Sequence, residues 1–319
     1  MDPLTDLVRA PRALDAFLLR VVMAPPWSVR VQDEAPLTVL ALTGGAATLT
    51  PDGGPALDLM AGDVVLVRGP GPYVVADRAG TEPQALIHPG GRCETPDGTS
   101  LELPMRQGVR SWGNAGDGPD TMLVGTYERA GEVGARLLGA LPSTVLLRPG
   151  PDRSPLLTAL VDVLATEVVA EEPGQAGLLD RLLDALVVAA CREWSASTAG
   201  VPAWLGGDDP LVRAALALLH EEPARPWTVA SLAGAVGLSR AALARRFADA
   251  VGEPPMGYLT GWRLAVAADR LRDTDETVAA VSRAVGYTSP FTFSTAFKRV
   301  YGTGPLAWRR AEARVLAAG

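Results

Sequence analysis

The C-terminal third of the chain carries the same residue pattern twice, beginning at Thr228 and again at Thr277, 49 positions later. Each copy opens with Thr-Val-Ala, continues through Ala-Val-Gly and ends in an apolar helical pattern that closes on a phenylalanine. Threonine suits a helix start because its hydroxyl accepts from an unpaired backbone N–H group. Glycine suits a helix end because it adopts the left-handed conformation at little cost. Two helices joined by a short turn with a glycine form a helix–turn–helix unit, so the pattern predicts two units, at 228–248 and 277–300.

Two unrelated helical hairpins are the alternative interpretation of this repeat. The matched caps, turn glycines and terminal phenylalanines favour helix–turn–helix units. Between the copies, residues 252–275 place apolar side chains at helical spacing, which predicts a connecting helix that fixes the separation of the units. Residues 210–319 are therefore expected to form one all-α DNA-binding domain.

The charge of the chain is distributed unevenly. The whole chain has a net charge of −7, which by itself argues against nucleic acid as a partner. Residues 1–205 hold 15 basic and 25 acidic groups, whereas residues 206–319 hold 14 basic and 11 acidic groups. A basic end on an acidic body is typical of a chain whose basic end binds nucleic acid. The repeat lies in this basic segment, and the coincidence favours DNA binding.

Residues 1–150 are expected to form a β-sandwich or small barrel, because short β-rich runs alternate with Gly, Pro and Asp. Residues 151–198 change to a helical period and predict an antiparallel helical hairpin. The hairpin either covers the open side of the sheet domain or forms a dimer interface, and the two roles are compatible. Small residues, prolines and a Gly-Gly pair make 199–209 the expected linker. The expected fold class is α+β, with a sheet-rich N-terminal part and an all-α C-terminal part.

The segment "GYTSPFTFSTAFKRVYGTGPLAWRR" resembles the signature of the AraC-type transcription regulators. The matching residues are Gly286, Tyr287, Ser289, Phe293, Phe297, Lys298, Gly302, Pro305 and Arg309. The resemblance implies two units that place recognition helices in successive major grooves. The stretches "LDLMAGDVVLVRGPGPYVVADRAG" and "TMLVGTYERAGEVGARLLGALPSTVLLRP" look like the cupin-type effector domain of part of this family. That implies DNA binding modulated by a small-molecule effector.

Carried over position by position, the family pattern places the first recognition helix at 239–248. Its outward residues are Arg240, Ala241, Ala244 and Arg245. We expect Arg245 to read a base, because a guanidinium can bond O6 and N7 of guanine together, and Arg246 to contact phosphate. A solvated surface position is the alternative for both arginines.

The second recognition helix is placed at 289–300. Phe293 and Phe297 lie four residues apart and are expected in the core, whereas Phe291 points about 200° away from Phe293. We expect Phe291 to pack on thymine methyl groups in the major groove. The other residues expected at the DNA are Ser289, Pro290, Ser294, Thr295, Lys298 and Arg299. The two basic residues among them are expected to meet phosphate.

Aromatic and polar residues of the sheet domain are the candidates for an effector pocket. They are Trp27, Tyr73, His88, Cys93 and Trp112, and core or loop packing is the alternative for each. A redox- or metal-responsive regulator built on Cys93 and His88 is a second hypothesis. A metal-dependent cupin enzyme fused to a DNA-binding domain is a third. The chain has two histidines, and one in the sheet domain cannot make a two-histidine metal site. We therefore expect no enzymatic activity, no cofactor and no metal site.

The remaining expectations concern location and partners. No apolar run has the roughly 18 residues of a membrane span, and the first residues lack a signal-peptide pattern, which predicts a cytoplasmic protein with no membrane contact. The expected partners are double-stranded promoter or operator DNA, an unidentified small effector, a second copy of the chain as a homodimer, and RNA polymerase. The sequence identifies neither the effector nor the operator, nor whether the output is activation or repression.

Overall fold

The computed structural model describes residues 16–150, 154–198, 201–202, 207 and 209–318. The chain divides into two compact units. The sheet unit comprises residues 11–130 and 141–197, and the helical unit comprises residues 1–10, 131–140 and 198–319. Most of the expected linker, 199–209, lies outside the described residues.

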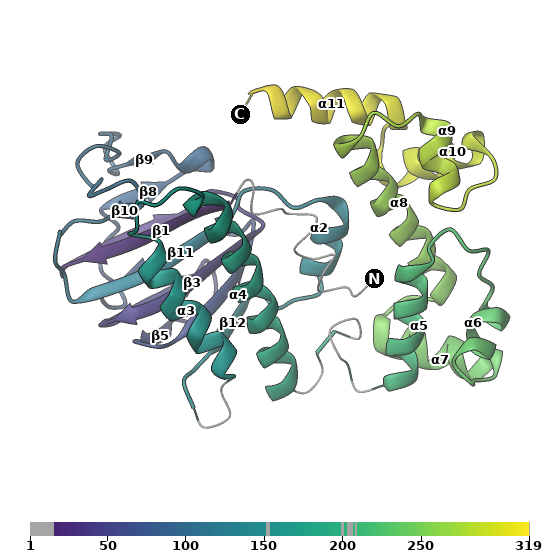
Figure 1. Cartoon of the computed structure of the whole chain (residues 1–319), viewed down its shortest axis with the longest axis horizontal. Helices are drawn as coiled ribbons and strands as arrows, with labels where there is room; N and C mark the ends of the chain where they lie inside the picture. The colour runs from purple at the N-terminus through teal and green to yellow at the C-terminus, as the bar shows by residue number, and fades with distance from the viewer. Residues whose placement is uncertain (1–15, 151–153, 199–200, 203–206, 208, 319) are drawn as a thin grey trace. The chain divides into compact units, whose positions relative to one another are not determined.

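Within the described residues, the sheet unit contains two six-stranded sheets (Figure 1). The first sheet has the order β10 (Ser111–Trp112), β1 (Ala16–Met23), β11 (Asp120–Tyr127), β3 (Leu37–Gly44), β6 (Val64–Arg68) and β12 (Thr144–Leu147). The second has the order β5 (Leu57–Met60), β4 (Ala46–Pro51), β7 (Tyr73–Ala76), β2 (Ser28–Val31), β8 (Ala85–Ile87) and β9 (Cys93–Glu94), with the short 3₁₀ turn η2 (Pro89–Gly91) before β9. Only two pairs in these sheets, β1 with β10 and β2 with β8, run parallel.

The core of the sheet unit lies between the two sheets. Strand β3 contributes Leu40 and Leu42 at alternate positions, and Leu49 and Val75 come from the opposite sheet. Alternate residues of a strand point to the same face, so each sheet buries one face against the other. This arrangement confirms the predicted sheet-rich N-terminal part.

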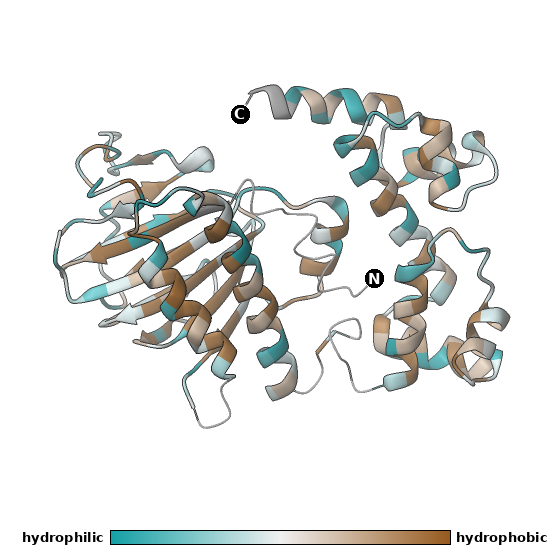
Figure 2. Ribbon diagram, viewed as in Figure 1, coloured by the Kyte–Doolittle hydropathy of each residue, from teal (hydrophilic) through white to brown (hydrophobic). Residues whose placement is uncertain are grey.

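The predicted helical hairpin consists of α3 (Pro155–Glu167) and α4 (Gln175–Ser197), which lie against the first sheet (Figures 1 and 2). Leu183 of α4 packs onto Gly125 of β11, where a Cβ atom would lie 2.5 Å from its Cδ1 atom. The buried stripe of α3 consists of Leu157, Leu160, Val161 and Leu164. Leu156 and Val163 border this stripe and are 52% and 47% exposed.

The helical unit is built from eight described helices. They are α2 (Glu132–Leu138), α5 (Pro210–Glu221), α6 (Val229–Ala235), α7 (Arg240–Val251), α8 (Pro255–Asp273), α9 (Val278–Ala284), α10 (Pro290–Tyr301) and α11 (Pro305–Ala318). Helix α8 lies between the two helix–turn–helix pairs along the chain. Helix α2 comes from the part of the sequence assigned to the sheet domain, between β11 and β12, and yet packs against α8.

Candidate nucleic-acid interface

Helices α6 and α7 form the first helix–turn–helix unit. The Thr228 hydroxyl accepts from the Ser231 backbone N–H (3.0 Å), and the Ser231 hydroxyl accepts from the Thr228 backbone N–H (2.9 Å). This reciprocal pair is a capping box that starts α6. Gly237 has φ of 72°, which ends the helix, and Ser239 caps α7 by accepting from the Ala242 N–H at 3.2 Å. Each local element predicted from the repeat is present.

Helix α7 is buried on one face and open on the other. Leu243 and Phe247, four residues apart, are completely buried. Arg240, Ala241 and Arg245 are exposed, and Ala244 is half-buried. Arg246 is held differently from the expectation of a free phosphate contact, because its Nε donates to Asp209 Oδ2 at 2.6 Å.

Asp209 is a residue that the sequence analysis missed. Its carboxylate also accepts from the backbone N–H groups of Leu211 and Val212, and so caps α5. An aspartate directly before a proline at a helix start was the available signal. A phosphate contact by Arg246 would use the guanidinium N–H groups that Asp209 leaves free.

Helices α9 and α10 repeat the arrangement. Thr277 caps α9 by accepting from the Ala280 N–H at 3.2 Å, Gly286 has φ of 86°, and Ser289 caps α10 by accepting from the Thr292 N–H at 3.4 Å. The cap uses one lone pair of the Ser289 hydroxyl, which keeps its proton and its second lone pair for other partners.

The three phenylalanines of α10 separate as the sequence predicted. Phe293 and Phe297 are completely buried, and Phe291 is 82% exposed. Pro290 begins the helix beside Phe291. Thr295 is exposed and donates to the Phe291 carbonyl at 3.0 Å, and Ser294 is half-buried. The α10 surface is therefore apolar at its N-terminal end and hydroxyl-bearing in the middle.

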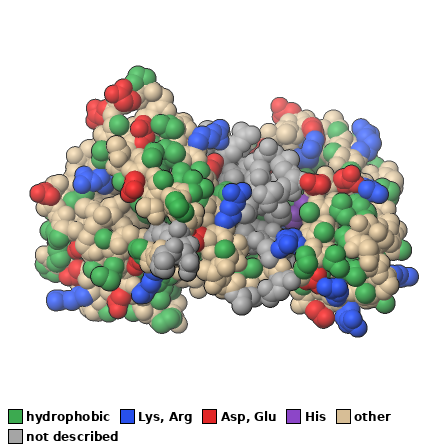
Figure 3. All heavy atoms as spheres, turned by 60° about the horizontal axis from the view of Figure 1, so that its bottom comes forward, with side chains coloured by type: hydrophobic (Ala, Val, Ile, Leu, Met, Phe, Trp, Pro, Cys, Tyr) green, Lys and Arg blue, Asp and Glu red, His purple; other side chains and the backbone are tan. Residues whose placement is uncertain are grey.

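Lys298 and Arg299 lie exposed in the second half of α10. Among the described residues, neither forms an ion pair, and neither do Arg240 and Arg245 of α7. Figure 3 shows acidic and basic side chains interspersed on the face in view. Individual unpaired cations, rather than one broad basic field, distinguish these helices.

The two helix–turn–helix units are also joined near the loop between α5 and α6. Arg263 of α8 donates to the carbonyl groups of Pro223 (2.6 Å) and Arg225 (2.8 Å). Gly286 of the second unit approaches the same loop so closely that a Cβ atom would lie 2.6 Å from the carbonyl oxygen of Ala224. Helix α8 and this contact together connect the two units.

A buried histidine of α5 packs against α8. The ring of His220 stacks on Trp262 with centroids 3.8 Å apart, and its Nε2 lies 2.7 Å from the Tyr258 hydroxyl. Burial lowers the pKa of His220 to about 3, so the ring is neutral near pH 7.

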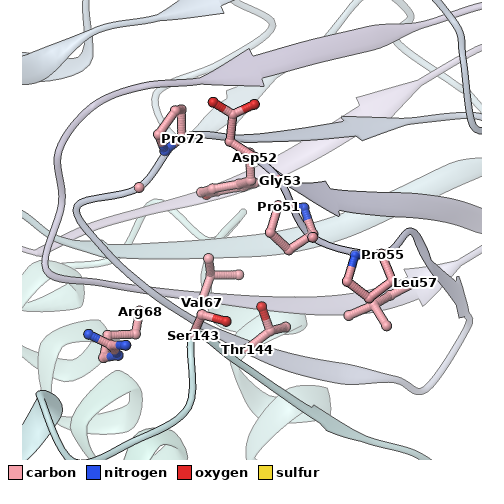
Figure 4. Close-up of a pocket in the computed structure, with 13 residues that line it drawn as sticks. Pro51, Asp52, Gly53, Pro55, Leu57, Val67, Arg68, Pro72, Ser143 and Thr144 are labelled. Atoms are coloured by element: carbon pink, nitrogen blue, oxygen red, sulfur yellow. The ribbon is translucent and has the colours of Figure 1, made fainter.

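The candidate effector residues do not form one cluster around a cavity. Trp27 is buried and donates from Nε1 to Asp120 Oδ2 at 2.8 Å, and Cys93 is buried in the core. The Nε2 atom of His88 lies 2.9 Å from Oε1 of Glu94, and Trp112 is half-buried in β10. Tyr73 alone of the five lines the cavity shown in Figure 4.

That cavity has a volume of about 430 Å³ and lies where the β4–β5 and β6–β7 turns meet the start of β12. Its wall includes Pro51, Pro55 and Leu57 on one side and Val67 and Thr144 on the other (Figure 4). The Thr144 hydroxyl is buried and has no hydrogen-bond partner.

Two observations bear on the redox or metal alternative. Burial raises the pKa of Cys93 to about 11, which keeps its thiol protonated near pH 7 and therefore unreactive. Among the described residues, no three His, Cys, Asp or Glu side chains come together in a group that could hold a metal ion. Neither observation favours a sensor built on Cys93 and His88.

A family model described as Cupin matches residues 2–196, and one described as Helix-turn-helix domain matches residues 232–311. An AraC-like transcription regulator of Streptomyces antibioticus is 30% identical over 314 residues, which cover 97% of this chain and 99% of the relative. A similar regulator of Streptomyces lividans is 30% identical over 317 residues, with 97% and 98% covered. Among solved structures, the DNA-binding domain of AdpA in complex with a target DNA is 29% identical, covers 35% of this chain and 100% of that domain, and has a TM-score of 0.33.

None of the described helices is long and apolar enough to cross a membrane. The two Streptomyces relatives, which match along nearly their whole length, are named as regulators of transcription and not as enzymes. The chain belongs to the AraC-like transcription regulators, DNA-binding proteins in which a cupin domain precedes a helix–turn–helix domain.

Proposed function

We propose that α7 and α10 read a specific operator sequence, and that a small molecule bound by the sheet unit modulates this reading. The observation that carries the proposal is the matched geometry of the two helices. Each is capped by a serine, is anchored by a buried apolar pair, and presents unpaired side chains on the opposite face.

Arg245 supplies base reading in the first unit. It is exposed, lies two residues after the buried Leu243, and has no ion-pair partner among the described residues. A free guanidinium on a recognition helix suits the O6 and N7 acceptors of guanine. Arg246 contributes through phosphate, within the limit that Asp209 sets.

The test begins with an operator selected from random duplexes by the purified chain. Fluorescence anisotropy at fixed salt then compares duplexes that differ at single positions. Arg245→Ala is expected to lose about 1–3 kcal/mol of discrimination at one G·C pair. Arg192→Ala, which removes an equally exposed charge from α4, is the control. Unchanged selectivity in Arg245→Ala would refute the assignment.

Phe291 supplies apolar reading in the second unit. Phe291 is 82% exposed, and moving its apolar surface out of water lowers the free energy of the complex. The thymine methyl group is the apolar feature of the major groove. Replacing operator thymines with uracil, one at a time, removes only that methyl group. Wild-type protein should bind one uracil duplex more weakly, and Phe291→Ala should not distinguish thymine from uracil there.

Effector modulation rests on the cupin domain and on the cavity beside Tyr73. A ligand that favours one of two DNA-competent states shifts the population toward it. The measurement is a titration of the selected operator with the full chain, with and without small-molecule fractions from the host cell. Coupling of about 1–3 kcal/mol predicts a 5- to 150-fold change in affinity with one fraction. No change with any fraction would remove effector modulation from the proposal.

We further propose a homodimer acting in the cytoplasm, with RNA polymerase as a later partner. Leu156, Val163, Val169 and Leu178 of the hairpin segment expose between 46% and 52% of their surfaces, which supports contact with a second copy. Sedimentation velocity of wild type and of Leu156→Asp measures the state of assembly. A monomer at micromolar concentration in wild type would contradict the dimer.

A further inference from the structure

Helix α2 packs along α8, the helix between the two helix–turn–helix units, although it comes well before α8 in the chain. It belongs to the helical unit, whereas the strands on either side of it, β11 and β12, belong to the sheet unit. The DNA-binding role proposed above does not involve α2, so its contacts need a separate explanation.

The N-terminal end of α2 is fixed to the end of α8. Both carboxylate oxygens of Asp269 accept from α2, from the backbone N–H of Glu132 at 2.7 Å and from that of Val133 at 3.1 Å. These N–H groups have no partner within α2, and its N-cap residue, Gly131, has no side chain to cap them. Asp269 is itself held by Arg272 at 3.2 Å.

The same end of α2 lies against the half of α8 that packs on the second unit. Leu264 and Leu271 of this half belong to one buried cluster with Phe293 and Phe297 of α10. Through Asp269, α2 is therefore fixed to the half of α8 that anchors the second recognition helix.

One helical turn later, α2 contacts the half of α8 that packs on the first unit. Arg136 forms an ion pair with Glu253, in the turn after α7, and its guanidinium carbon lies 4.8 Å from the ring centroid of Tyr258. Tyr258 in turn packs edge-on against Phe247 of α7 at 5.7 Å. Gly261 of α8 permits this approach, because a Cβ atom there would lie 2.5 Å from Arg136 Nη1.

The start of α2 is thus fixed to the half of α8 that packs on the second unit. Arg136, one turn later, contacts Tyr258 in the half of α8 that packs on the first unit. Val133 and Leu137, which are buried, hold the helix in place. We propose that α2 is a brace that sets the separation of the two recognition helices, with Asp269 and Arg136 as its positioning residues. The inference rests on the proposed function, in which α7 and α10 read DNA together.

Strands β11 and β12 flank α2 in the chain. In this proposal a shift of either strand is passed to the helix that spaces the two helix–turn–helix units. The relevant quantity is therefore the spacing between the two DNA elements that the protein accepts, rather than its affinity for either element alone.

Spacing tolerance tests the proposal directly. The selected operator is compared with variants that carry one extra base pair between the two elements, which turns the second element by about 34°. A rigid wild-type protein should lose about tenfold or more in affinity on the insertion. Asp269→Asn removes the charge and one of the two acceptors for the α2 N–H groups. The affinity of this variant should fall clearly less on the insertion. Its affinity for a duplex with a single element should equal that of wild type.

The matched control is Asp273→Asn, because Asp273 is an exposed carboxylate on the same helix that pairs with Arg272 and, among the described residues, forms no hydrogen bond or ion pair with α2. Asp273→Asn should lose as much affinity as wild type when one base pair is inserted. Arg136→Met, which keeps the length of the side chain and removes the ion pair, gives an independent second variant. If either brace variant retained the full wild-type loss, or lost binding to a single element as well, the brace would be overturned. A wild-type chain that selected no operator would instead refute the proposed function.

Discussion

The two helix–turn–helix units share a backbone plan but differ in what they present to solvent. Both have a threonine cap, a left-handed glycine in the turn, a serine cap and a completely buried apolar pair. The outward face of α7 carries arginines, whereas that of α10 carries Phe291, hydroxyl groups and the only lysine of the chain. Inward positions are constrained by packing, and outward positions are not.

The turn glycines offer the largest test of this shared plan. Gly237 and Gly286 have nearly the same φ, but a Cβ atom on Gly237 would meet open space, and one on Gly286 would overlap the backbone of Ala224. Gly237→Ala should cost about 1–2 kcal/mol for the left-handed conformation alone. Gly286→Ala should add about 1–3 kcal/mol from overpacking.

Hydrogen exchange of the amides in α6–α7 and α9–α10 measures the local free energy of opening in each variant. Equal losses in the two units would mean that the contact of Gly286 with the α5–α6 loop does not constrain the second unit. That outcome would break the distinction between an isolated first turn and a second turn that is packed against its neighbour.

Local signals in the sequence predicted the plan of both units because caps, turn glycines and i,i+4 apolar pairs act within a few residues. Residues 228–248 and 277–300 agree with α6–α7 and α9–α10 to within a few residues at each end. The contacts around these helices depend on partners far away in the chain. Asp269 and Glu132 are 137 residues apart, and the local sequence around either residue does not indicate that the other is its partner.

The sheet unit shows the same limit. The alternation of apolar residues predicted its strands, but residue type could not separate a pocket wall from a core position. Trp27 and Cys93 were chosen as effector candidates because they are aromatic or polar, and both lie buried, Trp27 with its indole N–H bonded to Asp120. Six of the thirteen residues that line the cavity are instead prolines and glycines of turns, which come together only when both sheets are folded.

Lowering the pH should destabilise the first helix–turn–helix unit more than the second, by less than the glycine substitutions do. His220 contacts Tyr258, which packs on Phe247 of the first unit. The pKa of His220 in the folded state, about 3, lies below the unfolded value of 6.5. As pH falls below 6.5 the unfolded chain takes up a proton that the folded chain does not, so the free energy of unfolding falls by about 1.4 kcal/mol per pH unit. At pH 5 the first unit should have lost roughly 2 kcal/mol.

Hydrogen exchange at pH 5 and pH 7, corrected for the intrinsic exchange rate, compares α5–α7 with α9–α10. His220→Gln should flatten the pH dependence of the first unit, because glutamine does not titrate. A pH dependence that is equal in the two units, or unchanged in His220→Gln, would assign the acid response to carboxylates instead.

The smallest expected effect separates contacts with phosphate from contacts with bases. Lys298 is exposed on α10, and Arg245 is exposed on α7. If Lys298 meets one phosphate, Lys298→Ala should reduce the slope of log affinity against log salt by about 0.9 and weaken all duplexes alike. Lys298→Arg should restore the slope, and Phe291→Ala, which removes no charge, should leave it unchanged while altering sequence preference. A slope that stays constant in Lys298→Ala would place the lysine off the DNA backbone and leave the second unit to bind through its apolar and hydroxyl groups.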